Sequence, residues 1–162
     1  MDFQEVDKRL SDNKELLGRL KDKGVNDLDI KKVENVIVRD MLVFMYTSYQ
    51  DNVRNAIIFR VKRHSNNSKE IVSFVRLRTK KINLKVDDLE KLLELFNRAY
   101  SAKFKQLCNS DEEVKLYSNI IEGRINVAHY QGNNLQIGSL NEVETAHDKA
   151  RHLLQKFESS MW

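Results

Sequence analysis

Apolar residues recur along this chain with the spacing of amphipathic helices. From residue 3 to residue 23 they mark one helix face, and the pattern ends at Gly24. A second, long helix is expected from a cap at Asp27 or Asp29 to about Arg63, and its middle is too apolar for a surface helix. This helix is therefore predicted to be the central, most buried element.

Three further helix starts follow. Asp87 or Asp88 can cap a helix that runs through Tyr100. The segments Ser110 to Glu113 and Ser139 to Glu142 each carry a serine three residues before a glutamate, the arrangement of a capping box. The first is expected to open a helix through Ile121, and the second the last helix of the chain.

The segment 65–86 has a different pattern. A loop is indicated by His64 to Ser68, and Val75 to Arg78 and Ile82 to Val86 alternate with period two, as extended chain does. The two pieces can pair as a short hairpin or lie along the helices. We predict an all-α fold, a bundle of four to five helices with one irregular basic excursion at 65–86.

Composition supports this architecture. The 162 residues include no proline and five glycines, which allows long helices, and the length suits a single domain spanning 1–162. The longest apolar run, Met41 to Tyr46, is far shorter than the roughly 20 residues of a membrane-spanning helix. Because Asp2, Glu5 and Asp7 come first, a signal peptide is not expected. One cysteine, Cys108, excludes a disulfide scaffold. A cytoplasmic protein with no membrane partner is expected.

Charge is unevenly distributed. The net charge is +4, yet the segment from Arg54 to Lys81 holds nine basic residues and one acid, Glu70, so it carries +8 and the rest −4. Such a block is typical either of a polyanion-binding surface or of a solvated basic loop. The candidate RNA-binding residues within it are Arg60, Lys62, Arg63, Arg76, Arg78, Lys80 and Lys81.

The candidate chemistry lies at the end of the helix that begins near Ser110. Arg124 offers a planar cation that fits a phosphate, and His129 titrates near neutral pH. Asn126 can orient either of them. These groups suffice for metal-free RNA cleavage by a ribose 2′-hydroxyl. Motifs for metals, nucleotides or serine hydrolysis are absent, so neither a cofactor nor a metal is expected.

The spacing by itself also fits a surface arginine and a packed histidine. On an ideal helix, five residues separate two side chains by about 140° around the axis and ~7.5 Å along it. Arg124 and His129 therefore converge only if the helix bends or ends there, or if a second subunit supplies a matching pair. Another histidine, His147, sits four residues before Arg151, and both are expected on the surface of the last helix.

The chain resembles the HEPN domains, and more closely the stand-alone bacterial HEPN proteins. In that group a helix ends in a segment like Arg-Asn-x-x-Ala-His-Gly, to which residues 124–132 are similar. Less specific similarity extends to three amphipathic stretches, at 44–50, at 82–92 and from 139 to 149, so that the likeness covers most of 28–160. Only the Arg-x4-His segment is specific to the family.

The resemblance implies a metal-independent endoribonuclease that acts as a homodimer, with the two Arg-x4-His motifs facing across one cleft. Proteins of this family commonly serve as toxins or in defence against phage, often beside an antitoxin protein. By this resemblance Arg124 holds the scissile phosphate, His129 is the acid and base, and Asn126 supports them.

The chain departs from the family pattern at three positions. Ile125 follows the arginine where the family has a polar residue, Tyr130 replaces the glycine after the histidine, and Gln50 stands about where a glutamate is frequent. A shifted but working site fits these changes, and so does a member that binds RNA without cutting it. The alternatives are thus a non-catalytic helical module that binds RNA or protein and a structural subunit of a larger assembly.

Overall fold

The computed structural model describes residues 1–66, 68–80, 82–128 and 135–162, and every regular element among them is a helix, which confirms the all-α prediction. Seven helices are present in these ranges, more than the four or five expected. They are α1 (Gln4–Asp22), α2 (Asp27–His64), α3 (Lys69–Arg78), α4 (Val86–Phe96), α5 (Arg98–Leu107), α6 (Asp111–Ala128) and α7 (Leu140–Ser160).

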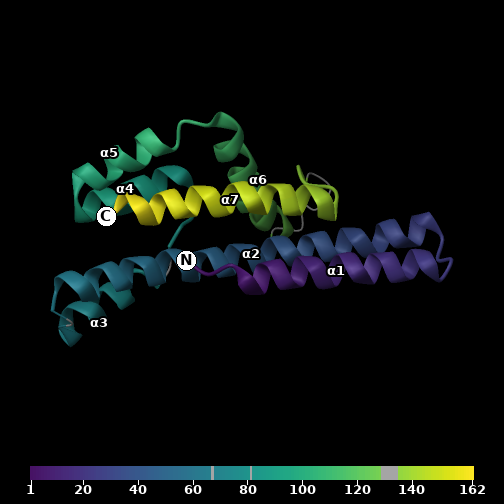
Figure 1. The fold of residues 1–162 in the computed structure, drawn as a ribbon, viewed down its shortest axis with the longest axis horizontal. Coiled ribbons are helices and arrows are strands. Elements are labelled where there is room, and N and C mark those ends of the chain that lie inside the picture. Colours follow the sequence, from purple (N-terminus) through teal and green to yellow (C-terminus); the bar gives the residue numbers. More distant parts are fainter. Residues whose placement is uncertain (67, 81, 129–134) are drawn as a thin grey trace.

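Helices α1 and α2 form a long antiparallel pair (Figure 1). The turn between them needs Gly24, whose φ of 74° lies in the left-handed region that glycine adopts at little cost. The cap of α2 is Asn26, not Asp27 or Asp29, and its side chain accepts a hydrogen bond of 3.0 Å from the backbone N–H of Asp29. Helix α2 ends at His64, one residue beyond the expected Arg63.

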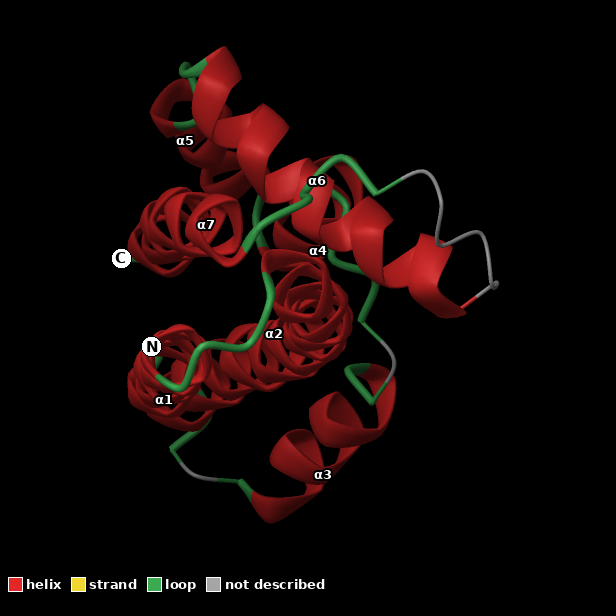
Figure 2. Ribbon diagram, turned by 90° about the vertical axis from the view of Figure 1, so that its right-hand side faces the viewer, coloured by secondary structure: helices red, strands yellow, loops and turns green. Residues whose placement is uncertain are grey.

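Helix α2 is the central element, as predicted. It packs against α1, α3, α6 and α7, and α7 in turn packs against α6 and α5 (Figure 2). Helix α3 packs on the C-terminal part of α2 at one end of the molecule, whereas α1 covers the other part (Figure 1). None of the helices in the described part of the chain is long and apolar enough to cross a membrane.

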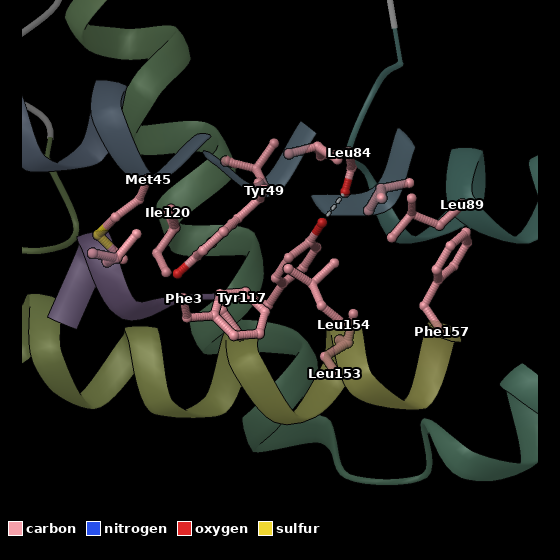
Figure 3. Packing of buried hydrophobic residues seen from close by; sticks show 14 of the residues in the cluster. Phe3, Met45, Tyr49, Leu84, Leu89, Tyr117, Ile120, Leu153, Leu154 and Phe157 are labelled. Carbon is pink, nitrogen blue, oxygen red and sulfur yellow. Dashed lines mark hydrogen bonds between the residues drawn. The ribbon is translucent and has the colours of Figure 1, made fainter. Parts of the chain in front are cut away.

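One hydrophobic cluster draws side chains from all seven helices. At its centre Tyr49 of α2, Tyr117 of α6 and Phe157 of α7 are fully buried (Figure 3). The Tyr117 hydroxyl donates a 2.7 Å hydrogen bond to the carbonyl of Leu84, so the polar tip of this ring is satisfied inside the core (Figure 3). That bond ties the segment before α4 to α6.

The extended interpretation of Val75 to Arg78 is wrong, because these residues belong to α3. Ser68 caps this helix, and Val72 and Val75 are buried against the bundle. Residues 82–85 do lack regular secondary structure. Ile82 and Leu84 are buried, whereas Asn83 and Lys85 are exposed. They lie along the helices without a partner strand among the described residues, so the second alternative for this piece is the correct one and no hairpin forms there.

The helix expected from Asp87 through Tyr100 is two helices. Asn97 has extended backbone, with φ −166° and ψ 128°, and its side chain accepts a 2.9 Å hydrogen bond from the N–H of Ala99, which starts α5. Both serine caps are confirmed. Ser110 accepts a hydrogen bond from Glu113, and Ser139 forms a complete capping box with Glu142.

Candidate functional site

Arg124 stands where α6 crosses α2. The preceding residue is Gly123, which is buried and faces Leu42 of α2. A Cβ atom built on Gly123 would lie 2.9 Å from Leu42 Cδ1, closer than side-chain packing allows. Glycine therefore permits the two helices to approach closely at this point, and the approach brings Arg124 up to α2.

The guanidinium of Arg124 lies over the ring of Tyr46, with Cζ 4.8 Å from the ring centroid. Such stacking holds a cation without neutralising it. The ion pairs between described residues do not include Arg124, which is half-buried. One helical turn further along α2, the Gln50 amide donates to the Ile82 carbonyl at 2.5 Å and approaches the Tyr46 hydroxyl at 3.4 Å. Tyr46 and Gln50 thus support the position of this cation.

The structure does not bring Asn126, the other described member of the predicted catalytic set, beside Arg124. Asn126 is half-buried on the last turn of α6, and two helical residues turn a side chain by about 200°, to the opposite side of the helix. Ile125 packs against the hydrophobic core, which accounts for an apolar residue at this position of the motif. His129 and Tyr130 lie outside the described residues. Helix α6 continues to Ala128.

The predicted RNA-binding residues occupy separate parts of the α2–α3 end. Arg60 donates a 2.7 Å hydrogen bond to the Tyr100 hydroxyl and, with Arg63, lies over the ring of Trp162. Arg78 lies over the ring of Phe74, and Lys80 is exposed. Lys62 and Arg76 line one groove. Lys81 lies outside the described residues.

These basic residues differ from the basic residues elsewhere in the chain. In the other helices many lysines and arginines form ion pairs, as in Lys14 with Glu144 and Lys105 with Glu90. Among the ion pairs of the described residues, not one involves a basic residue between positions 60 and 80. The surface made by the end of α2 and by α3 consequently keeps its positive charge.

His147 is buried, and its expected surface position is wrong. The Tyr49 hydroxyl and His147 Nδ1 are 2.6 Å apart, and His147 Nε2 lies 3.0 Å from Asp7 Oδ1, which Arg151 also contacts (Figure 3 shows Tyr49 in the core). Burial raises the pKa of the Tyr49 phenol well above its usual value. The phenol therefore donates to Nδ1, and the proton on Nε2 points to Asp7. These hydrogen bonds join α1, α2 and α7.

The stability of the protein is expected to fall with acidification through His147. Burial lowers the pKa of this imidazole, although the hydrogen bond to Asp7 opposes the effect. The unfolded chain then binds more protons than the folded one below about pH 6.5, so this contribution is complete above that pH and declines beneath it. Between about pH 7.5 and about pH 5.5, the melting temperature of the wild type should fall more than that of His147→Gln. Equal falls would contradict this role for His147.

Neither a reactive thiol nor a metal-binding cluster is found among the described residues. Burial raises the pKa of the Cys108 thiol to about 11, so it is protonated and weakly nucleophilic at neutral pH. The histidine, cysteine, aspartate and glutamate side chains in 1–66, 68–80, 82–128 and 135–162 form no cluster of three or more that could hold a metal ion.

The sequence identified Arg124 as a candidate, but it did not reveal the contact of Arg124 with Tyr46 or the groove lined by Lys62 and Arg76. Tyr46 was included in a similar stretch without a role, although its spacing of four from Gln50 places the two on one helix face. Phe59 was not singled out in the sequence, and the structure leaves 57% of it exposed.

Comparison with protein-family models, with curated proteins and with solved structures found no significant match to this chain.

Proposed function

We propose that this chain is a HEPN-type, metal-independent endoribonuclease. The observation that supports the proposal best is the placement of Arg124, a cation without a carboxylate partner among the described residues, held over Tyr46 at the end of α6. It stands five residues before His129 in the one segment that is specific to the resemblance. The unpaired basic residues of α2 and α3 supply the attraction for the RNA backbone.

In the proposed reaction the ribose 2′-oxygen attacks the adjacent phosphorus and the bond from phosphorus to the 5′-oxygen breaks. His129 takes the proton from the 2′-hydroxyl or gives one to the departing 5′-oxygen. Arg124 stabilises the additional negative charge on the phosphoryl oxygens as the new bond forms. The products are a 2′,3′-cyclic phosphate and a 5′-hydroxyl.

A homodimer completes this site in the proposal. Arg124 and Asn126 point to opposite sides of α6, so one subunit does not assemble the full set on a regular helix. A second copy would place its own Arg124 and His129 across the same cleft. The cellular role we propose is that of a toxin or an antiphage effector in the cytoplasm, controlled by an antitoxin protein.

The proposal is tested by incubating the protein with transfer RNA and single-stranded RNA in EDTA and analysing the ends of the products. We expect cleavage that persists in EDTA and leaves 2′,3′-cyclic phosphate ends. Products with 3′-hydroxyl ends, or cleavage that EDTA abolishes, would contradict the proposal.

The second candidate function is a helical module that binds RNA without cutting it. One observation favours it: the basic surface lies on the C-terminal part of α2 and on α3 (Figure 1), whereas Tyr46 is near the middle of α2. Salt-dependent RNA binding without any cleavage would support this second function over the first.

A further inference from the structure

A groove of about 480 Å³ lies between α2 and α3, apart from the Arg124 site. It is lined by Arg54, Asn55, Ile58, Phe59, Lys62 and Arg76. Phe59 is thirteen residues beyond Tyr46 along α2, about 20 Å at 1.5 Å per residue. The groove is therefore a separate surface from the one on which Arg124 lies.

The charge of the groove favours an anionic ligand. Lys62 of α2 and Arg76 of α3 line the groove from different helices, and neither has an ion pair with a described carboxylate. Arg54 is 3.5 Å from Asp51, a contact between two partly exposed side chains one helical turn apart. Such exposed pairs are weak and screened by solvent, so Arg54 remains able to contact a phosphate.

An aromatic ring stands in the wall of this basic groove. Phe59 is 57% exposed, and its ring meets the ring of Trp162 edge to face, with centroids 6.2 Å apart. Trp162 is 49% exposed and carries the guanidinium groups of Arg60 and Arg63, at 4.5 and 5.0 Å from its centroid. The aromatic pair and its two arginines continue the cationic surface of the groove around the end of α2.

We propose that this groove is a binding site for single-stranded nucleic acid, with an unpaired base stacked on Phe59. Alternation of phosphate-binding cations with an exposed aromatic face is the arrangement by which proteins hold single strands. Base pairs in a duplex stack on one another and hide their faces, so a duplex can use the cations but not the Phe59 ring.

A short acidic peptide fits the charge of the groove less well than a nucleic acid does. Carboxylates can pair with Lys62 and Arg76, but they leave the ring of Phe59 exposed. A second copy of this chain docked symmetrically here would bring the same positive charges together, which is unfavourable. Phosphates and bases together satisfy both features of the groove.

This inference deepens the proposed function, because the groove would hold the RNA at a distance from the cleavage site. Its test is chosen to be independent of cleavage. A dodecamer of deoxythymidine has no 2′-hydroxyl, so the reaction proposed for Arg124 and His129 cannot cut it. Loss of cleavage activity and loss of groove binding are thus separate results.

The experiment measures binding of the fluorescein-labelled dodecamer by anisotropy, with the same strand in a duplex and with polyglutamate as comparison probes. We expect the single strand to bind more tightly than the duplex. Phe59→Ala should weaken single-strand binding by roughly tenfold or more, whereas Phe59→Tyr, which keeps the ring, should retain it. Phe59 is largely exposed, so both variants are expected to fold.

Charge is tested by salt titration. Between about 50 and about 200 mM salt, Arg76→Ala should bind less tightly and lower the salt dependence by roughly one phosphate contact. Lys115→Ala, which removes an exposed lysine of α6 away from the groove, should change neither quantity. A protein that binds no probe, or one for which duplex binds as tightly as single strand, would overturn the proposal. Polyglutamate binding with the same Phe59 dependence would assign the groove to an acidic protein instead.

Discussion

Arg124→Ala is expected to lower the rate of RNA cleavage by roughly 100-fold or more, because loss of one group that stabilises transition-state charge typically has this effect. Arg124→Lys should recover only part of the rate, since lysine keeps the charge but loses the planar fork. His129→Ala should lower the rate by a similar or larger factor, about 100-fold to 10,000-fold for a general acid or base. Initial cleavage rates on one RNA in EDTA measure all three.

The contact between Arg124 and Tyr46 provides a second readout of the same site. Tyr46→Phe keeps the ring beneath the guanidinium and should retain cleavage, whereas Tyr46→Ala removes it and should reduce the rate. The exposed Arg19, which pairs with Glu15 on α1, provides the control, because Arg19→Ala leaves the site untouched. If Arg124→Ala and His129→Ala both cut at the wild-type rate, the assignment of this site is wrong.

Lys156→Met should lower the free energy of unfolding by about 3 kcal/mol, because it leaves the Glu113 carboxylate buried without its partner. The two side chains form an ion pair between α6 and α7, and that of Glu113 is only 6% exposed. A loss of this size in a chain of 162 residues corresponds to a fall of roughly 6 to 12 °C in melting temperature. Thermal and urea unfolding of the variant measure both quantities.

The double variant Glu113→Leu with Lys156→Met is the matched control. It removes both charges, and well-packed apolar residues can replace a buried ion pair at little or no cost. It should therefore recover most of the lost stability. Arg19→Ala, which breaks an exposed pair on α1, should cost less than about 1 kcal/mol. Equal losses from Lys156→Met and from Arg19→Ala would show that the buried environment of Glu113 has no energetic consequence.

The sequence predicted the long elements of the fold well, because their signals are local. Gly24 ends α1, a run of apolar residues identifies α2 as central, and Ser139 starts α7 with a capping box. Each of these depends on residues within a few positions of one another. The interaction of a side chain with its own helix is enough to specify them.

The errors have a common origin in tertiary contacts. Alternation at 75–78 is compatible with a helix because α3 has apolar residues on both its buried and its exposed faces, with Leu77 exposed and Val75 buried. At 82–85 the alternation is real, yet buried Ile82 and Leu84 pack against helices without a strand partner. At 82–85 the period of the pattern thus shows which residues are buried, and not what buries them.

The candidate site was only partly accessible to sequence reasoning for the same reason. Arg124 was identified from its spacing to His129, which is local. Its support comes from Tyr46, almost eighty positions earlier, and depends on the close crossing at Gly123. The burial of His147 likewise depends on Tyr49 and Asp7, and helix periodicity carries no information about those distant partners.

The unpaired charges on α2 and α3 also bear on which part of the molecule opens first. Helix α3 has ten residues and is anchored on α2 mainly through Val72 and Val75, while basic side chains on both helices repel one another. Counterions weaken that repulsion, so the docking of α3 depends on ionic strength more than that of the other helices. A bound polyanion would act in the same direction, and α3 would then be most firmly in place when the groove is filled.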